Sequence, residues 1–376
     1  MSEVSFKPVG VDRARLTALL NEQNLDGVLL SSPENVFYAT GYPCLPTSGN
    51  PILYALRNRL PFFAYAGRDG ALILLCWGGA AMGIDYGTED VRMSFTPEML
   101  ADDLAALVDE KLKPGCRVAL ESTCPYFAVR LIQERAQPAA IADADDLFYG
   151  LRLVKTPAEV ARIRTSTQII DRTVMELAAA LRPGMGRLEL IREAKAGMLR
   201  NGADGVDHVT VAFGGANPEV ALDEPLEANQ IVTLDLGAVY QGYVSDNRRL
   251  VYTGTVPAAL KQLHGKLCGV VEELGKALVP GTTFGQLHAR AGELFAQAGL
   301  EPMFLHVGHS MGLQVEEHWI VADDPTPVRP GMVLNIELYS GSEEGVMVGD
   351  EETYLVTAGA PEQLSTLPVD IIEKHF

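Results

Sequence analysis

Cysteine is scarce and unpatterned in this chain of 376 residues. The five cysteines are odd in number and form no C-x-x-C pair: Cys44, Cys76, Cys116, Cys124 and Cys268. Such spacing excludes a disulfide framework and a site in which thiolates hold a metal. It fits a protein of a reducing compartment.

Basic residues are also in short supply. The chain has 30 lysines and arginines against 49 aspartates and glutamates, which gives a net charge of −19. Nucleic acids and anionic membranes are bound through basic patches, so we expect neither of them as a partner.

Long hydrophobic runs are missing as well. The longest apolar stretch, Ala71–Ile84, contains several glycines and is too short to span a bilayer. The chain does not open with a basic patch followed by an apolar segment, so no signal peptide is expected. The nucleotide-binding patterns G-x-G-x-x-G and G-x-x-x-x-G-K-[ST] do not occur. These absences predict a soluble, cytoplasmic protein.

The order of predicted elements divides the chain into two domains. In residues 1–152 helices and strands alternate, which predicts an α/β domain; the acidic run 143–146 is expected to be a solvated loop. Thr156, Pro157 and Glu159 then form a complete helix-start signal. Residues 153–376 contain further helical patterns at 187–200, 258–277 and 284–298 and end in a strand-rich third, which predicts an α+β domain.

A β-hairpin is predicted for Ile231–Arg249, where apolar residues alternate on both sides of a turn. If the turn is centred between Tyr240 and Gln241, Asp235 and Asp246 lie directly opposite each other. Opposed residues have Cβ atoms roughly 4.5–5.5 Å apart, and two like charges at that distance are destabilising. A neighbouring cation or a bound metal would remove the repulsion.

Three more ionisable residues interrupt apolar segments of the same domain. Glu337 lies within GMVLNIELY, Glu351 begins ETYLVT, and His309 lies between Gly308 and Gly312. Buried carboxylates are costly unless they are paired or bound to metal. A salt bridge to Arg248 or Arg249 explains one of them, but four carboxylates and a histidine are harder to explain in this way. They would balance two divalent cations, and such oxygen-rich ligands suit Mn, Co, Fe or Zn.

The order and spacing of these segments resemble the creatinase/aminopeptidase ("pita-bread") metallopeptidase family, which includes Xaa-Pro aminopeptidases and prolidases. Four family patterns match: D-x-G…G-Y-x-x-D-x-x-R, H-x-x-G-H-x-x-G-L, G-M-V-x-x-I-E and E-[DE]-T-x-L-V-T. They fall on 235–249, 306–313, 331–337 and 351–357. Residues 25–42 and 151–159 resemble the opening of the family's N-terminal domain and its linker, so the likeness covers nearly the whole chain.

The resemblance implies a creatinase-type N-terminal domain at 1–152 and a pita-bread catalytic domain at 153–376. It implies that two divalent ions bind to five ligands: Asp235, Asp246, His309, Glu337 and Glu351. Asp246 and Glu351 would bridge the ions, and Glu337 would also assist proton transfer from a metal-bridging hydroxide. The implied substrate is an Xaa-Pro dipeptide, of which a C–N bond would be cleaved. The implied assembly is a homodimer.

The sequence departs from the family pattern at three positions. Glu316 stands where the family has a histidine, Gly349 where it has an arginine, and no histidine follows the glycine loop 214–218. An ionised Glu316 cannot donate a proton; it would repel an oxyanion or attract a cationic substrate group. The candidate substrate-binding residues are three histidines, and Glu316 joins Glu337 as a candidate catalytic residue. The histidines are His208, His306 and His318.

Other functions fit parts of the sequence. The same metal site could serve a non-peptide enzyme, either a small-amide hydrolase or a lyase, and the fold could belong to a non-catalytic binding protein. Residues 308–312 also satisfy G-x-S-x-G, the nucleophile pattern of serine hydrolases, with Ser310 as nucleophile. That mechanism needs an acid and then a histidine downstream, and only His318 and His375 follow.

Overall fold

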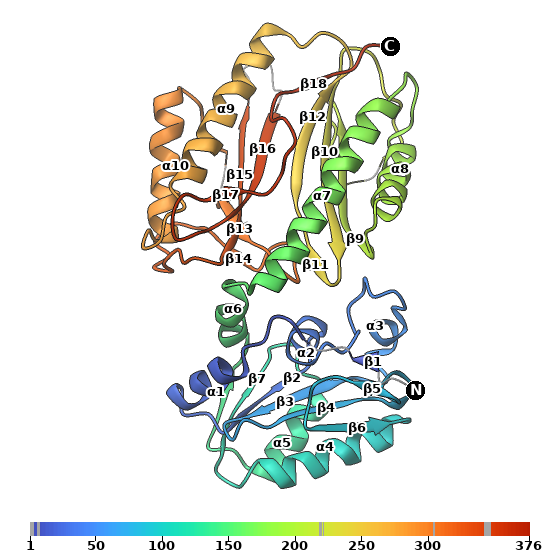
Figure 1. Cartoon of the computed structure of the whole chain (residues 1–376), viewed down its shortest axis with the longest axis vertical. Coiled ribbons are helices and arrows are strands. Elements are labelled where there is room, and N and C mark those ends of the chain that lie inside the picture. The colour runs from blue at the N-terminus through green and yellow to red at the C-terminus, as the bar shows by residue number, and fades with distance from the viewer. Residues whose placement is uncertain (1–3, 6–7, 218–219, 221, 304, 342–346) are drawn as a thin grey trace. The chain divides into compact units, whose positions relative to one another are not determined.

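The chain forms two compact units, Met1–Arg152 and Leu153–Phe376, in a computed structural model (Figure 1). The structure describes residues 4–5, 8–217, 220, 222–303, 305–341 and 347–376. None of the helices within these ranges is long and apolar enough to cross a membrane.

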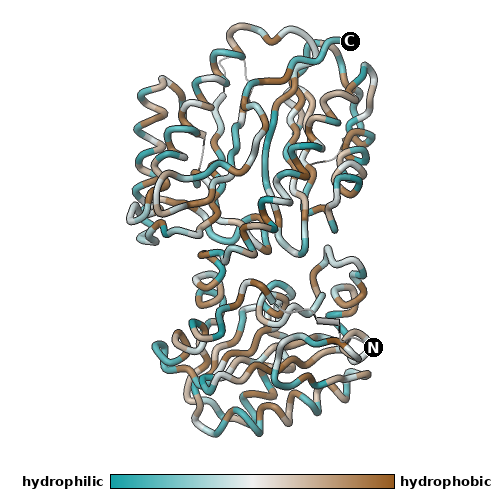
Figure 2. Tube along the Cα trace, in the orientation of Figure 1, coloured by the Kyte–Doolittle hydropathy of each residue, from teal (hydrophilic) through white to brown (hydrophobic). Residues whose placement is uncertain are grey.

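The first unit is built on a six-stranded sheet in the order β6-β4-β3-β2-β7-β8. Its central strands are buried, except for the half-buried Trp77 at the end of the strand Leu72–Trp77, and they appear as apolar stretches in Figure 2. The strands are β2 (Gly27–Leu30), β3 (Phe63–Gly67), β4 (Leu72–Trp77), β6 (Asp90–Ser94), β7 (Arg117–Leu120) and β8 (Ala140–Asp143), with a separate pair β1 (Val4–Ser5) and β5 (Ile84–Asp85). The helices are α1 (Arg13–Glu22), α2 (Pro33–Thr40), α3 (Ile52–Leu56), α4 (Pro97–Lys111), α5 (Tyr126–Ala136) and α6 (Asp145–Leu153).

The acidic run at the end of this unit is not the solvated loop that we predicted. Asp143 ends β8, and Asp145 and Asp146 form the first turn of α6. Acidic side chains are favourable there because the helix N-terminus carries partial positive charge. The α/β class of the unit is confirmed.

The second unit has a ten-stranded sheet with the central order β11-β10-β12-β16-β15-β13-β14. Helices α7 and α8 pack against β10 and β9, whereas α9 packs against β15 and β16 (Figure 1). The helices are α7 (Pro157–Ala180), α8 (Arg187–Arg200), α9 (Ala258–Lys276) and α10 (Phe284–Ala298). The strands are β9 (Gly205–Phe213), β10 (Ile231–Tyr240), β11 (Tyr243–Val244), β12 (Asn247–Tyr252), β13 (Gly308–Ser310), β14 (His318–Trp319), β15 (Val333–Gly341), β16 (Met347–Leu355), β17 (Glu362–Gln363) and β18 (Ile372–Glu373).

A capping box starts α7, as the sequence predicts. The Thr156 side chain accepts from the backbone N–H of Glu159, and the Glu159 carboxylate accepts from the N–H of Thr156. Two of the four backbone N–H groups that a helix start leaves unsatisfied are thereby bonded.

The hairpin forms at Ile231–Tyr252, but its predicted register is wrong. Tyr240 pairs with Tyr243, so the turn is centred between Gln241 and Gly242. Both turn residues have positive φ, +49° and +86°, which is the conformation of a type I′ turn. Asp235 consequently lies opposite Arg248 and not opposite Asp246.

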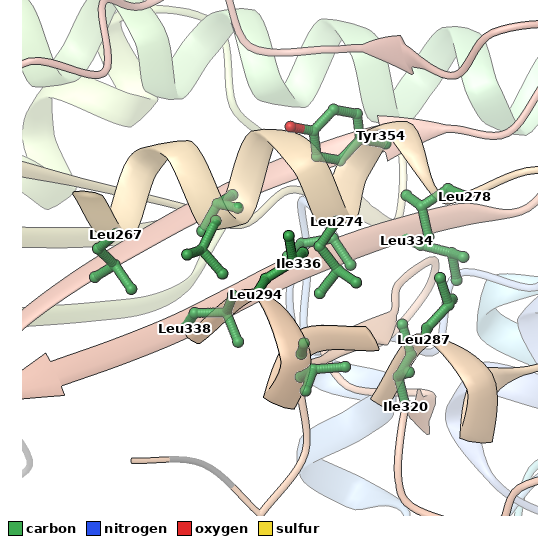
Figure 3. Close-up of a cluster of buried hydrophobic side chains, with 14 of the residues drawn as sticks. Leu267, Leu274, Leu278, Leu287, Leu294, Ile320, Leu334, Ile336, Leu338 and Tyr354 are labelled. Carbon is green, nitrogen blue, oxygen red and sulfur yellow. The ribbon is translucent and has the colours of Figure 1, made fainter. Parts of the chain in front are cut away.

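Apolar side chains lock α9 and α10 onto the sheet. Leu274 of α9 lies beside Ile336 of β15 in a fully buried cluster (Figure 3). The cluster includes Leu267, Leu274 and Leu278 of α9 and its C-terminal end, Leu287 and Leu294 of α10, and Leu334, Ile336, Leu338, Ile320 and Tyr354 of the sheet side. Because β15 and β16 carry the two candidate glutamates, this core fixes the backbone beneath the site.

Candidate metal centre

Four charged residues form one row across four neighbouring strands of the second unit. Glu337 of β15 pairs with Glu351 of β16, Glu351 pairs with Arg248 of β12, and Arg248 pairs with Asp235 of β10. Directly paired residues project from the same face of a sheet. The backbone register therefore gathers three carboxylates around one guanidinium.

Asp246 belongs to the same cluster, because it lies two residues before Arg248. Ligand atoms of Asp246, His309 and Glu351 lie within 4.8 Å of one another, and all three residues are buried. The His309 Nε2 atom is 3.5 Å from an Asp246 oxygen. Within the described part of the chain, Glu351 Oε2 has no hydrogen-bond donor, and Asp246 Oδ1 has only the His208 Nε2 atom, 3.1 Å away. Buried carboxylate oxygens with so few donors beside an imidazole fit a divalent cation.

Burial and charge make this cluster unfavourable without a cation. Glu351 is 1% exposed. Burial and then the negative charges of Asp246 and Asp235 raise the pKa of Glu351 well above its ordinary value. A positive ion at this position would relieve both the desolvation and the repulsion.

His208 supplies a second possible ligand group. Its Nε2 atom lies 3.2 Å from Asp235 Oδ1 and 3.1 Å from Asp246 Oδ1, and the three residues could together hold an ion. Burial alone would lower the pKa of His208, but Asp246, Asp207 and Asp235 raise it well above its ordinary value. The ring lies over Gly237, where a Cβ would collide with it. The structure therefore brings His208, which we expected at the substrate, to the candidate metal ligands.

Arg248 occupies the centre of the row. Its Nη2 donates to Asp235 Oδ2, lies 3.5 Å from Glu337 Oε1, and its Nε is 4.0 Å from Glu351 Oε2. The guanidinium also lies over the ring of Tyr339, 4.5 Å from the ring centroid. The salt bridge that the sequence offered as an explanation for one carboxylate therefore exists, and that carboxylate is Asp235.

Three further residues hold the candidate ligands in place and were not anticipated. The Tyr339 hydroxyl donates to Glu337, and the Asn335 amide donates to Glu351. The Thr353 hydroxyl donates to the backbone carbonyl of Asp246 at 3.0 Å. Strand alternation could have found them, since each lies two residues from a candidate ligand and so shares its face.

Two of the three remaining predicted site residues, His306 and Glu316, belong to a chain of contacts that reaches His309. Trp319 stacks on His306 with ring centroids 5.6 Å apart, and His306 meets His309 edge-on at 6.4 Å. Trp319 Nε1 donates to the exposed Glu316 at 2.7 Å. His318 instead bonds to Asp324 at 2.8 Å. The structure thus links Glu316 and His306 to His309 and directs the His318 ring to Asp324.

Ser310 does not have the surroundings of a serine nucleophile. It lies in strand β13, not on a turn between a strand and a helix, and it is fully buried. His318 lies opposite it but bonds to Asp324, and no described residue bonds the Ser310 hydroxyl. A nucleophile needs an adjacent base within hydrogen-bond reach.

Two protein-family models match this chain. The family described as metallopeptidase family M24 matches residues 161–358, and the creatinase/prolidase N-terminal domain matches residues 13–154. An Xaa-Pro dipeptidase of Pyrococcus furiosus is 26% identical over 360 residues, covering 93% of this chain and 96% of that protein.

Solved structures share the fold. A prolidase from Pyrococcus horikoshii superposes with a TM-score of 0.81 at 22% identity, covering 96% of this chain and 99% of that chain. An X-Pro aminopeptidase from Thermotoga maritima gives a TM-score of 0.79 at 24% identity with the same coverage. The predicted pita-bread fold is thereby confirmed. Since the M24 match spans more than half of the sequence, the chain belongs to metallopeptidase family M24.

Proposed function

We propose that this protein is a divalent-metal-dependent hydrolase that cleaves the C–N bond of an Xaa-Pro dipeptide. The observation that supports it most is the convergence of Asp246, His309 and Glu351, whose ligand atoms lie within 4.8 Å of one another. The dipeptide substrate is suggested by the relative from Pyrococcus furiosus, which is an Xaa-Pro dipeptidase.

A divalent ion held by these residues would polarise the carbonyl under attack and acidify a water. The resemblance implies two ions, such as Mn, Co, Zn or Fe, and the second would need the group of His208, Asp235 and Asp246. The first group is the better ligand set, because both oxygens of Asp235 already accept hydrogen bonds from side chains.

Glu337 is the residue best placed to move a proton. Its carboxylate is partly exposed, unlike that of Glu351, and lies in the same row of the sheet. The Tyr339 hydroxyl holds one of its oxygens. We assign Glu337 to take a proton from the attacking water and to deliver it to the leaving nitrogen.

A small cationic amide is the second candidate substrate. It is favoured by Glu316, which is exposed and bonded to Trp319 at 2.7 Å. A carboxylate beside an aromatic ring attracts a substrate cation by charge and by cation–π interaction. In that case Glu316→Gln raises KM for cationic amides and leaves KM for uncharged amides of the same size unchanged.

The direct test is metal analysis together with a hydrolysis assay on the full-length chain. We expect proline release from Xaa-Pro dipeptides after loading with Mn²⁺, and loss of both bound metal and activity in Asp246→Ala. Asp370→Ala, at an exposed aspartate of the same unit, is the matched control and should behave as the wild type. A wild-type chain that retains no metal after loading would refute the proposal.

Two coarser expectations accompany this function. We propose a homodimer, which light scattering of the full chain would measure, and a cytoplasmic location, which cell fractionation would measure. A monomer at micromolar concentration would contradict the first, and recovery in the membrane or exported fraction would contradict the second.

A further inference from the structure

Arg248 lies where the predicted second metal ion would need ligands. We propose that its guanidinium replaces one of two ions, so that the centre holds a single divalent cation bound by Asp246, His309 and Glu351. This inference rests on the proposed metal site but changes its composition. Asp235 becomes the partner of an internal cation and is no metal ligand.

The position of Arg248 is set by the backbone. It pairs with Asp235 on one side and with Glu351 on the other, in the middle of the row of four charged residues. A side chain at this register position projects from the same face as both carboxylates. The strand pairing therefore places the guanidinium of Arg248 among the carboxylates.

The hydrogen bonds divide the carboxylates into two classes. Both oxygens of Asp235 accept side-chain hydrogen bonds, Oδ2 from Arg248 and Oδ1 from His208. Glu351 Oε2, in contrast, is buried and has no donor among the described residues, and Asp246 Oδ1 has only the His208 Nε2 atom, 3.1 Å away, which it shares with Asp235. A buried acceptor without a donor is costly, so a ligand is needed beside Glu351 and Asp246, whereas Asp235 has a donor of its own in Arg248.

The surroundings of Arg248 are shaped to hold a guanidinium. A Cβ at position 349 would lie 2.6 Å from Arg248 Nη1 and 2.8 Å from the Tyr339 ring, so only glycine leaves the space free. The guanidinium lies over the Tyr339 ring, 4.5 Å from the ring centroid. A planar cation is stabilised over an aromatic face. Arg248 is only 9% exposed, so its side chain is packed within the site and does not extend into solvent.

Charge balance is compatible with one ion. Three carboxylates lie near Arg248 and Asp246 is the fourth of the site, so the arginine supplies one of the positive charges that a second metal would otherwise bring. A second divalent ion beside the guanidinium would add like-charge repulsion at short range in a buried place. The arrangement therefore disfavours two ions.

The test is metal stoichiometry in the intact chain. Mass spectrometry of metals after Mn²⁺ loading and dialysis should give about one ion per chain for the wild type and about two for Arg248→Met, which removes the charge and keeps the length. Arg248→Lys, which keeps the charge, is the matched control and should remain at about one. Circular dichroism establishes that the variants fold.

Electron paramagnetic resonance of the Mn²⁺-loaded wild type distinguishes one bound ion from a neighbouring pair without the use of a variant. A single Mn²⁺ gives a spectrum of an isolated ion, whereas a neighbouring pair gives an exchange-coupled spectrum. Two ions or a coupled spectrum in the wild type would overturn this inference and leave the proposed function standing. One ion in a folded Arg248→Met would also overturn it, and no ion in the wild type would overturn the proposed function itself.

Discussion

Substitution by alanine should stabilise the chain at two glycines of α9 but not at a third. Gly265 and Gly269 are exposed, and a Cβ at either position would meet nothing within 4 Å. A Cβ at the buried Gly275 would lie 2.6 Å from the hydroxyl oxygen and 2.8 Å from Cε2 of Tyr354. Tyr354 belongs to β16, the strand that also carries Glu351, and is 6% exposed.

Two free-energy contributions decide the outcome. Alanine is favoured over glycine in a helix by about 0.8–1.0 kcal/mol, and this gain applies to all three positions. At Gly275 the added methyl must displace a packed ring, and overpacking of a core costs typically about 1–3 kcal/mol. We therefore expect Gly269→Ala to stabilise the chain by about 1 kcal/mol, and Gly275→Ala to lie about 1–3 kcal/mol below it.

Urea unfolding of the full-length variants measures these differences, and hydrogen exchange of α9 peptides locates them. Tyr354→Leu removes the colliding ring, so Gly275→Ala should be stabilising in that background. If Gly275→Ala is as stable as Gly269→Ala in the wild-type background, the packing of α9 against β16 is not as described. A cost that persists after Tyr354→Leu would place the collision elsewhere.

Three further predictions concern stability. Leu274→Ala, at a fully buried position, should cost about 2.7–5.0 kcal/mol in urea unfolding, and a cost below 1 kcal/mol would contradict its place in the core. Thr156→Ala removes the cap of α7 and should cost about 1 kcal/mol, with faster hydrogen exchange in the first turn; unchanged exchange there would count against the capping box. Burial raises the pKa of Glu159, although its bond to the Thr156 N–H and the charge of Lys155 lower it. This raised pKa stabilises the fold at low pH, and the contribution is lost as the pH rises from the ordinary carboxyl pKa of about 4.3 through the raised one. The wild type should therefore lose stability relative to Glu159→Gln over that rise. A difference that does not change with pH would refute this.

Several helices of the second unit could be predicted closely because their signals are local. The predicted ranges 187–200 and 284–298 coincide with α8 and α10. Each follows from apolar spacing, and a capping box marks where α10 begins. The α+β order of the second unit and the pita-bread fold followed from the order of these elements and from the family motifs.

The counter-cation of the site was harder to predict, since it depends on contacts between distant segments. Arg248 meets Glu337, which lies 89 residues away, through the pairing of β12, β16 and β15. No spacing in the sequence reveals which strands become neighbours in a sheet. From the sequence alone, either Arg248 or Arg249 could therefore be the salt-bridge partner of a candidate ligand.

The wrong hairpin register shows why the carboxylates were nevertheless found. Moving the turn centre from between Tyr240 and Gln241 to between Gln241 and Gly242 changes every cross-strand partner by two residues. Side chains alternate with a period of two, so such a change leaves each of them on its face; a change of one would have reversed them all. The face of Asp235 and Asp246 was thus insensitive to the error. The residue opposite Asp235 was not, and it is this residue, Arg248, that decides how many metal ions the aspartates can share.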